Sequence, residues 1–198
     1  MKDQEPNAQN DLPEFEDQEY SYNVKIPKER IAVLIGKKGI EKAKIESIAN
    51  LKLNIDSEDG DVEILTKDPI QLFTAKEIIK AIGRGFNPEI ALQLLKQDYS
   101  FEQIIITDYV KHKNHVIRVR GRLIGKDGKS RETIENLTDT NISVYGKTVC
   151  IIGRIEYVSL AKNALISLIQ GSPHANVYKF LERRRREYKE AEMKEPGF

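Results

Sequence analysis

The strongest constraint on the fold is an internal repeat. The segment LIGKKGIEKAKIESI (34–48) recurs as LIGKDGKSRETIENL (123–137), with each position displaced by 89 residues. At the same displacement Glu46 matches Glu135, and apolar residues match apolar residues in the segments that follow. A repeat of this kind indicates a supersecondary unit that is present twice, and it predicts two copies of a module of roughly 65 residues.

Each copy has the sequence pattern of a β-α-α-β-β-α unit. Alternating apolar and polar residues indicate strands, and apolar residues three and four apart indicate helices. In the first copy we expect strands at 21–27, 51–56 and 61–65, and helices at 28–35, after Gly39, and from Asp68 to about Ile82. In the second copy we expect strands at 101–110, 141–146 and 148–152, and helices at 115–125, 129–138 and about 156–170. The pattern predicts an α+β fold in which each module has a three-stranded antiparallel sheet and three helices.

The repeat divides the chain into five parts. These are an acidic disordered segment (1–20), a first module (21–84), a helical linker (85–100), a second module (101–171) and a basic C-terminal helix and tail (172–198). In the linker, Asn87 is a candidate cap and Pro88 a first helical residue. The linker helix is too apolar for a free connection, so we expect it to pack between the modules and fix their orientation.

The charge of the chain is distributed unevenly. The net charge is +1 at pH 7, yet residues 1–20 carry one lysine and seven acids. Residues 25–44 carry seven bases and two acids, and residues 111–131 carry eight bases and one acid. Each basic cluster contains one copy of the glycine motif, so positive charge is concentrated at the repeat.

The core of the repeat is a pair of glycines separated by two residues and located between two expected helices. Glycine allows a tight turn with exposed amides, and without Cβ atoms a polynucleotide backbone can approach that turn closely. The following helix directs the positive end of its dipole at the same place, which attracts phosphate. The residues expected to bind RNA are Gly36, Lys37, Lys38, Gly39, Lys42, Arg118, Arg122, Ile124, Gly125, Lys126, Asp127, Gly128, Lys129, Ser130 and Arg131.

Both copies resemble type I KH domains, joined in tandem by the short helical linker. A single Gly-x-x-Gly motif is weak evidence, because a chain with 12 glycines contains roughly one by chance. Here Leu-Ile-Gly-Lys-x-Gly occurs twice in the same predicted context, which favours a clamp over a plain helix corner with solvated lysines. The resemblance implies that each clamp holds about four nucleotides of single-stranded RNA.

The two copies differ from each other and from the usual KH pattern. Many KH domains have an apolar residue three positions after the second glycine, where this chain has Lys42 and Arg131. The groove is then more polar than usual, or the base contacts come from a neighbouring face. Asp127 replaces Lys38 in the second clamp, but more bases surround that clamp. Arg118 and Arg122 share a helix face, and we expect the second module to bind RNA more strongly.

Three further segments make the resemblance more specific. GRGFNPEIALQLL between the modules, GRLIGKDGKSRETIENLT, and GSPHANVYKFLERRRRE near the C-terminus are similar to the archaeal Partner-of-Nob-One (Dim-two) family of ribosome-assembly factors. This resemblance implies binding near the 3′ end of small-subunit ribosomal RNA and assistance in pre-rRNA processing. It also implies two protein partners, a 3′-end processing endonuclease and the alpha subunit of translation initiation factor 2. Whether the first module binds RNA, protein or both stays open.

Several other functions are less well supported. The sequence has no apparent nucleophilic triad, P-loop or clustered carboxylates, so we expect no enzyme activity, no cofactor and no metal. His112, His115 and His174 are interpreted as surface residues, and Cys150 as a core residue. No apolar run is long enough to span a membrane and no signal peptide is apparent, which predicts a cytoplasmic protein. A general single-stranded RNA adaptor in RNA decay or translation initiation, and a protein scaffold, remain alternatives. The arginine run at 183–186 contacts RNA or is a solvated helix end.

Overall fold

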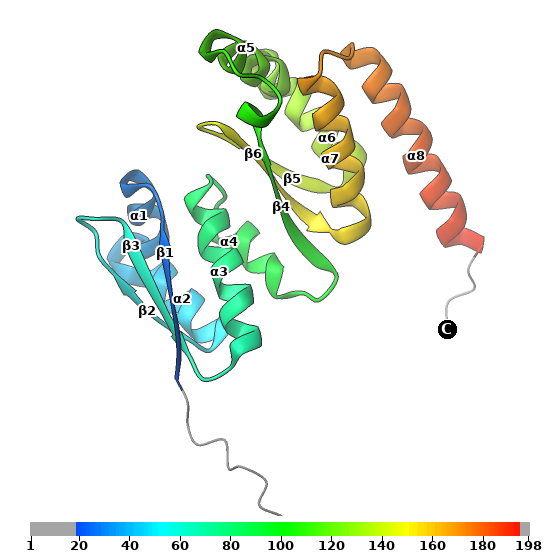
Figure 1. The fold of residues 1–198 in the computed structure, drawn as a ribbon. Coiled ribbons are helices and arrows are strands. Elements are labelled where there is room, and N and C mark those ends of the chain that lie inside the picture. The colour runs from blue at the N-terminus through cyan, green and yellow to red at the C-terminus, as the bar shows by residue number, and fades with distance from the viewer. Residues whose placement is uncertain (1–18, 195–198) are drawn as a thin grey trace, which may run out of the picture.

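The computed structural model describes residues 19–194, which form two α+β modules connected by a helical linker (Figure 1). The first module contains β1 (Tyr20–Lys25), α1 (Lys28–Ile35), the 3-10 turn η1 (Lys37–Gly39), α2 (Ile40–Ala49), β2 (Lys52–Ile55), β3 (Asp61–Thr66) and α3 (Pro69–Gly83). The linker contains α4 (Pro88–Ala91) and the 3-10 turn η2 (Leu92–Leu95). The second module contains β4 (Tyr99–Ile105), η3 (Ile106–Asp108), α5 (Lys113–Ile124), η4 (Lys126–Gly128), α6 (Lys129–Thr138), β5 (Thr140–Tyr145), β6 (Thr148–Arg154) and α7 (Ile155–Ile169), and α8 (His174–Lys194) follows it.

Each module has one three-stranded antiparallel sheet whose last strand lies in the middle. The strand orders are β1-β3-β2 and β4-β6-β5. In the first sheet Tyr20 pairs with Thr66 and Lys52 with Leu65, and in the second sheet Tyr99 pairs with Arg154. The predicted α+β class, with two three-stranded antiparallel sheets, is therefore confirmed.

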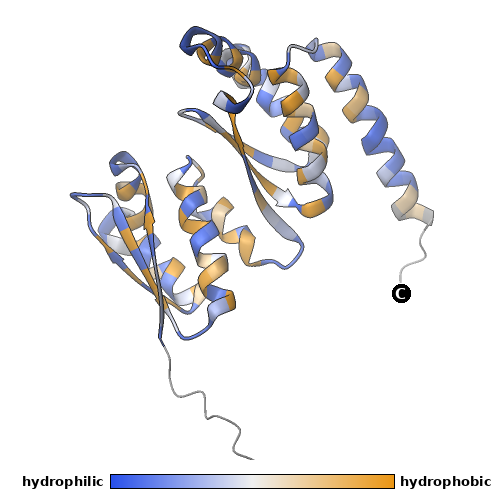
Figure 2. Cartoon of the chain, viewed as in Figure 1, coloured by the Kyte–Doolittle hydropathy of each residue, from blue (hydrophilic) through white to orange (hydrophobic). Residues whose placement is uncertain are grey.

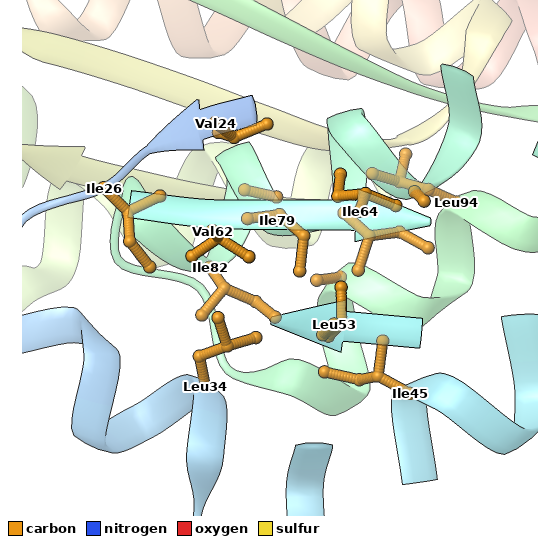
Figure 3. Close-up of a cluster of buried hydrophobic side chains, with 14 of the residues drawn as sticks. Val24, Ile26, Leu34, Ile45, Leu53, Val62, Ile64, Ile79, Ile82 and Leu94 are labelled. Atoms are coloured by element: carbon orange, nitrogen blue, oxygen red, sulfur yellow. The ribbon is translucent and has the colours of Figure 1, made fainter. Parts of the chain in front are cut away.

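The hydrophobic core of each module lies between its sheet and its helices. In the first module Leu34 of α1, Ile45 of α2 and Ile79 of α3 meet Leu53 and Ile64 of the sheet (Figure 3). The second core follows the same plan on the helix side of its sheet. Figure 2 shows hydrophobic residues along the strands and α7, whereas the middle of α8 is hydrophilic. Burial of these apolar side chains is the main driving force for each module.

The linker packs between the modules, as the sequence predicted. Ala91 and Leu94 are buried in one cluster with Cys150 and Ile152 of β6, on the face of the second sheet opposite its own helices. Figure 1 shows α3 and α4 between the first sheet and β4. Cys150 is a core residue, as predicted, and burial raises the pKa of its thiol to about 12.

Polar contacts hold the junction of the two modules. Arg30 Nε donates a hydrogen bond to the carbonyl oxygen of Ile82 at 2.8 Å, and its Nη2 donates to that of Phe86 at 2.7 Å. Ser143 Oγ donates to the carbonyl oxygen of Arg84 at 2.8 Å. These bonds reach carbonyls at and just beyond the C-terminal end of α3, where a helix leaves carbonyls without helical donors, and they connect α1 and β5 to this segment. The carbonyl oxygen of Ile82 also accepts from the amide of Gly85 at 3.1 Å.

Helix α8 is a continuous helix packed against α6 and α7. Val177 and Leu181 of the predicted apolar stripe are buried, and Phe180 is partly buried against the same core. The helix extends to Lys194, four residues beyond the expected end. Within residues 19–194, no helix is both long enough and apolar enough to cross a membrane.

Some boundaries differ from those predicted. The strand expected at 101–110 is β4, which begins at Tyr99 and ends at Ile105 because the next residue, Ile106, turns inward and is fully buried. The amide of Ile106 still donates to the carbonyl oxygen of Lys147, in register with the last pair of the ladder, Ile105 and Thr148. Asn87 is the N-cap residue of α4, as predicted, but its side chain makes no capping hydrogen bond. Residues 1–18 and 195–198 of the predicted disordered segment and tail lie outside the described residues.

Candidate nucleic-acid interface

The two glycine motifs form the same backbone turn in both modules. Each lies between two helices, at α1–η1–α2 and at α5–η4–α6. The four glycines have φ values of +71°, +80°, +75° and +80° in chain order, for Gly36, Gly39, Gly125 and Gly128. Lys38 and Asp127, the residues before each second glycine, both have φ of +55°. The repeat in sequence is therefore a repeat in backbone geometry, and the turn requires positive φ at three of its four positions.

The two glycines of each pair have different roles. A Cβ on Gly36 would lie 2.5 Å from Glu41 Cγ, and one on Gly125 would lie 2.7 Å from the amide nitrogen of Ser130. A Cβ on Gly39 or Gly128 would meet nothing within 4 Å. The first glycine is thus required by close packing of the chain on itself. Only the second glycine leaves free space that a ligand backbone can enter, which corrects the expectation that both serve this approach.

Lysines and free amides surround each turn. Lys37, Lys38, Lys126 and Lys129 are exposed, and none forms an ion pair with another part of the described chain. The amides of the two residues between the glycines donate no hydrogen bond to another element of residues 19–194. Unpaired amides next to a helix N-terminus are an anion-binding arrangement, and Asp127 is the one acidic residue between the glycines of the second turn.

Behind each turn, an acid–base pair bridges the helix to the edge strand. In the second module Glu135 Oε1 accepts a hydrogen bond from the amide of Ile142 at 2.7 Å, and its Oε2 lies 3.7 Å from Arg131 Nε. Arg131 Nη1 also donates to the carbonyl oxygen of Ile142 at 3.4 Å. Burial raises the pKa of Glu135. The surface between α6 and β5 is therefore polar, and Arg131 contacts the edge strand of its own module.

The first module repeats this bridge. Glu46 Oε1 accepts from the amide of Leu53 at 2.8 Å and lies 3.8 Å from Lys42 Nζ. Reasoning from the sequence missed the role of the glutamates, although the match of Glu46 with Glu135 in the repeat was a signal for it. Lys42 and Arg131 thus take equivalent places between the second helix and the edge strand of their modules.

The second module also shows that two candidate residues serve the fold. Arg122 Nη2 donates to the carbonyl oxygen of Ser172 at 2.5 Å, immediately before α8. Ser130 is buried, and its hydroxyl accepts a hydrogen bond from Tyr178 of α8 at 3.1 Å. Arg118, one turn before Arg122, is exposed and makes no ion pair within residues 19–194. Ile124 is half-buried at the end of α5. Arg118 therefore faces solvent, whereas Arg122 and Ser130 contact the C-terminal segment.

The described part of the chain holds no candidate metal site. Within residues 19–194, no group of three or more His, Cys, Asp or Glu side chains is placed to hold a metal ion. The rings of His112 and His115 contact each other edge to face at 5.6 Å on the exposed start of α5. His174 Nε2 lies 3.0 Å from the carbonyl oxygen of Arg122, so it helps to hold the start of α8.

Comparisons with known proteins agree with this geometry. The family model for the eukaryotic type KH domain (KH-domain type I) matches residues 100–186. The KH domain-containing protein MJ0443 of Methanocaldococcus jannaschii is 52% identical over 172 residues, which cover 85% of this chain and 75% of that protein. A Dim2p crystallised in an a/eIF2alpha-aDim2p-rRNA complex from Pyrococcus horikoshii superimposes with a TM-score of 0.80 and 47% identity, over 88% of this chain and 97% of that one. The chain belongs to the archaeal PNO1/Dim2 family.

The PNO1/Dim2 family also has eukaryotic relatives. The pre-rRNA-processing protein PNO1 of Eremothecium gossypii is 36% identical over 115 residues, which cover 57% of this chain. The matched region is only 43% of that relative's own length. The similarity to the eukaryotic protein therefore concerns a part of it, whereas the archaeal Dim2p is matched over nearly its whole length.

Proposed function

We propose that this chain is an RNA-binding ribosome-assembly factor that holds single-stranded RNA near the 3′ end of small-subunit ribosomal RNA and assists its maturation. Both modules are type I KH domains in tandem on this proposal. The observation that carries it is the second glycine of each pair, whose missing side chain leaves open space beside unpaired lysines and free amides. The names of the relatives, which include a pre-rRNA-processing protein and a complex with rRNA, support the choice of RNA.

The second module is the stronger RNA clamp in this proposal, because Arg118 adds an exposed charge on the helix that leads to the turn. The chain itself is proposed to act without catalysis, in the cytoplasm. Its proposed protein partners are the alpha subunit of translation initiation factor 2, which is present in the Pyrococcus complex, and a 3′-end processing endonuclease. Because Arg131 and Glu135 contact β5, the proposed contacts with RNA bases lie on the open side of the turn, at Gly128.

Titration of an RNA from the 3′ terminus of the small-subunit rRNA tests the clamp. We expect the affinity to fall as the salt concentration rises. For each phosphate neutralised, log K should decrease by about 0.7 per tenfold increase in salt. Lys126→Asp should weaken binding more than Lys37→Asp. Lys179→Asp, an exposed site on α8, is the matched control for the charge change. Equal binding by the wild type and the Lys37→Asp/Lys126→Asp double variant would reject the clamp.

The location on ribosomal RNA needs a separate experiment. Cross-linking followed by sequencing of bound RNA should place reads at the small-subunit 3′ terminus. A flat distribution over all transcripts would favour the alternative, a general single-stranded RNA adaptor in RNA decay or translation initiation.

A further inference from the structure

A cleft separate from both glycine turns lies at the junction of the modules. Its volume is about 670 Å³, and its walls are β1 with the connection to α1, the C-terminal end of α3, and Gln103 of β4. Figure 1 shows α3 between β1 and β4. None of residues 36–39 or 125–128 lines it. We call this the inter-module cleft.

The residues that line the inter-module cleft carry a net positive charge. Four bases and one acid, Asp59, line it; the bases are Lys25, Lys28, Lys80 and Arg84. Lys25 is 3.4 Å from Asp61 in an exposed pair, and Lys80 is 3.3 Å from Glu77. Lys28 and Arg84 form no ion pair with another described residue. A concave site with unpaired charge of one sign raises the local concentration of a polyanion.

The bases at the C-terminal half of α3 and its cap form a row. Lys76 and Lys80 of α3 and Arg84, the residue that follows the helix, are spaced four residues apart. On an isolated helix, like charges at this spacing are destabilising by roughly 0.2–0.5 kcal/mol per pair. Beside this row, Tyr22 is 40% exposed, with the ammonium of Lys76 at 4.2 Å from the centre of its ring. A basic groove with an exposed aromatic ring is the usual composition of a surface for single-stranded nucleic acid.

The junction contacts hold the inter-module cleft in shape. Arg30 bonds the carbonyl oxygens of Ile82 and Phe86, on either side of Arg84. The carbonyl oxygen of Arg84 accepts from Ser143 of the second module. The two walls are therefore connected by hydrogen bonds, and a ligand that binds between them does not need to order the junction first.

We propose that the inter-module cleft binds the sugar-phosphate backbone of an RNA strand that extends beyond a glycine clamp, and that it does so without reading the sequence. This inference rests on the proposed function. The row of bases neutralises phosphates, and Tyr22 offers a ring for a base to stack on. An acidic peptide, such as the acidic segment at residues 1–20, would need only the positive charges of the cleft. The exposed ring of Tyr22 therefore favours RNA, whose bases can stack on it.

The test compares short and long RNA. The variant Lys28→Gln/Arg84→Gln removes two charges whose side chains have no ion pair, and Lys179→Gln/Lys189→Gln removes two exposed charges from α8 as a control. Each full-length protein is titrated by fluorescence anisotropy with an RNA of about six nucleotides, enough for one four-nucleotide clamp, and with one of about 30 nucleotides of the same 3′ sequence. Thermal unfolding checks that both variants are folded.

We expect the cleft variant to bind the short RNA as the wild type does and the long RNA roughly tenfold more weakly, with a salt slope smaller by about 1.4 for two lost phosphate contacts. The control should keep both affinities. Unchanged affinity and slope for the long RNA would overturn the proposal, as would tighter binding, which would identify the acidic segment as the occupant. The glycine clamp is tested separately, by the affinity of the Lys126→Asp variant for the short RNA.

Discussion

Glu135 and Ile142 are joined by a 2.7 Å hydrogen bond that connects helix α6 to the edge strand β5. The carboxylate of Glu135 accepts a hydrogen bond from the backbone amide of Ile142, and Arg131 donates one to the carbonyl oxygen of the same residue. Both polar backbone groups of an edge position are thus satisfied by one helix, which protects the edge from pairing with another strand. The same bridge at Glu46 and Leu53 shows that this is a property of the repeated module.

The bridge gives a pH prediction for Glu135. Burial raises the pKa of its carboxyl above the ordinary value of 4.5, so the folded state binds this proton more tightly than the unfolded state does. The contribution of this carboxyl to stability is therefore largest below 4.5 and declines as the pH rises through the raised folded pKa. Glu135→Gln keeps an oxygen acceptor for Ile142 and abolishes this titration. Urea unfolding should show the free energy of unfolding of the variant rising relative to that of the wild type between pH 4 and pH 7.

A suitable control for that measurement is Glu182→Gln, an exposed site on α8. The control should follow the wild-type pH profile. A constant difference between Glu135→Gln and the wild type across the pH range would contradict the prediction.

The two glycines of the second turn should respond differently to alanine. Gly128→Ala costs about 1–2 kcal/mol for its positive φ, because its Cβ meets no atom within 4 Å. Gly125→Ala should cost roughly 1–3 kcal/mol more through overpacking, since its Cβ lies 2.7 Å from the Ser130 amide nitrogen. Urea unfolding measures both. Equal losses of stability would show that the first glycine is not needed for packing.

Alanine at the second glycine of each turn also tests RNA binding. Gly128→Ala places a methyl group in the open space beside the turn, so RNA affinity should fall even where the protein remains folded. Gly39→Ala is the corresponding change in the first module and should have the smaller effect on RNA.

Arg122 and Arg118 offer a matched comparison on one helix. Arg122→Ala leaves the carbonyl oxygen of Ser172 without its donor and should destabilise the docking of α8 by about 1.5–3 kcal/mol. Hydrogen exchange of the α8 amides measures this loosening. Arg118→Ala should leave exchange unchanged and weaken RNA binding, because its side chain faces solvent. The reverse pattern would mean that the two arginines exchange roles in solution.

Arg30 should control how firmly the modules are joined. Arg30→Met keeps much of the side chain but removes both hydrogen bonds to the junction. The carbonyl oxygen of Ile82 keeps the Gly85 amide as a donor, whereas that of Phe86 loses its donor, at a cost of about 1–3 kcal/mol. We expect a lower melting temperature and a broader distribution of module orientations in small-angle X-ray scattering. Lys28→Met, an exposed change on the same helix, should alter neither.

The repeat, the order of the elements and most of their bounds were predictable from the sequence. Helix α1 at Lys28–Ile35 and helix α6 at Lys129–Thr138 agree with the expected ranges. Asp68 caps α3 as expected, with its Oδ1 accepting from the amide of Ile70 at 2.8 Å. These features depend on apolar periodicity, turn residues and caps, which act over a few residues and are visible in the chain itself.

The tertiary structure alone decided which candidate residues are free to meet a ligand. Ser130 is buried under Tyr178, and Arg122 is bound to Ser172, because α8 returns across the module from about 50 residues away. Lys28 and Arg84 likewise line the same inter-module cleft, although they are distant in sequence. Local patterns determine which elements form, whereas contacts between distant segments determine which side chains they cover. The sequence therefore specified the two turns, and only the packing of the modules showed which side of each turn is open.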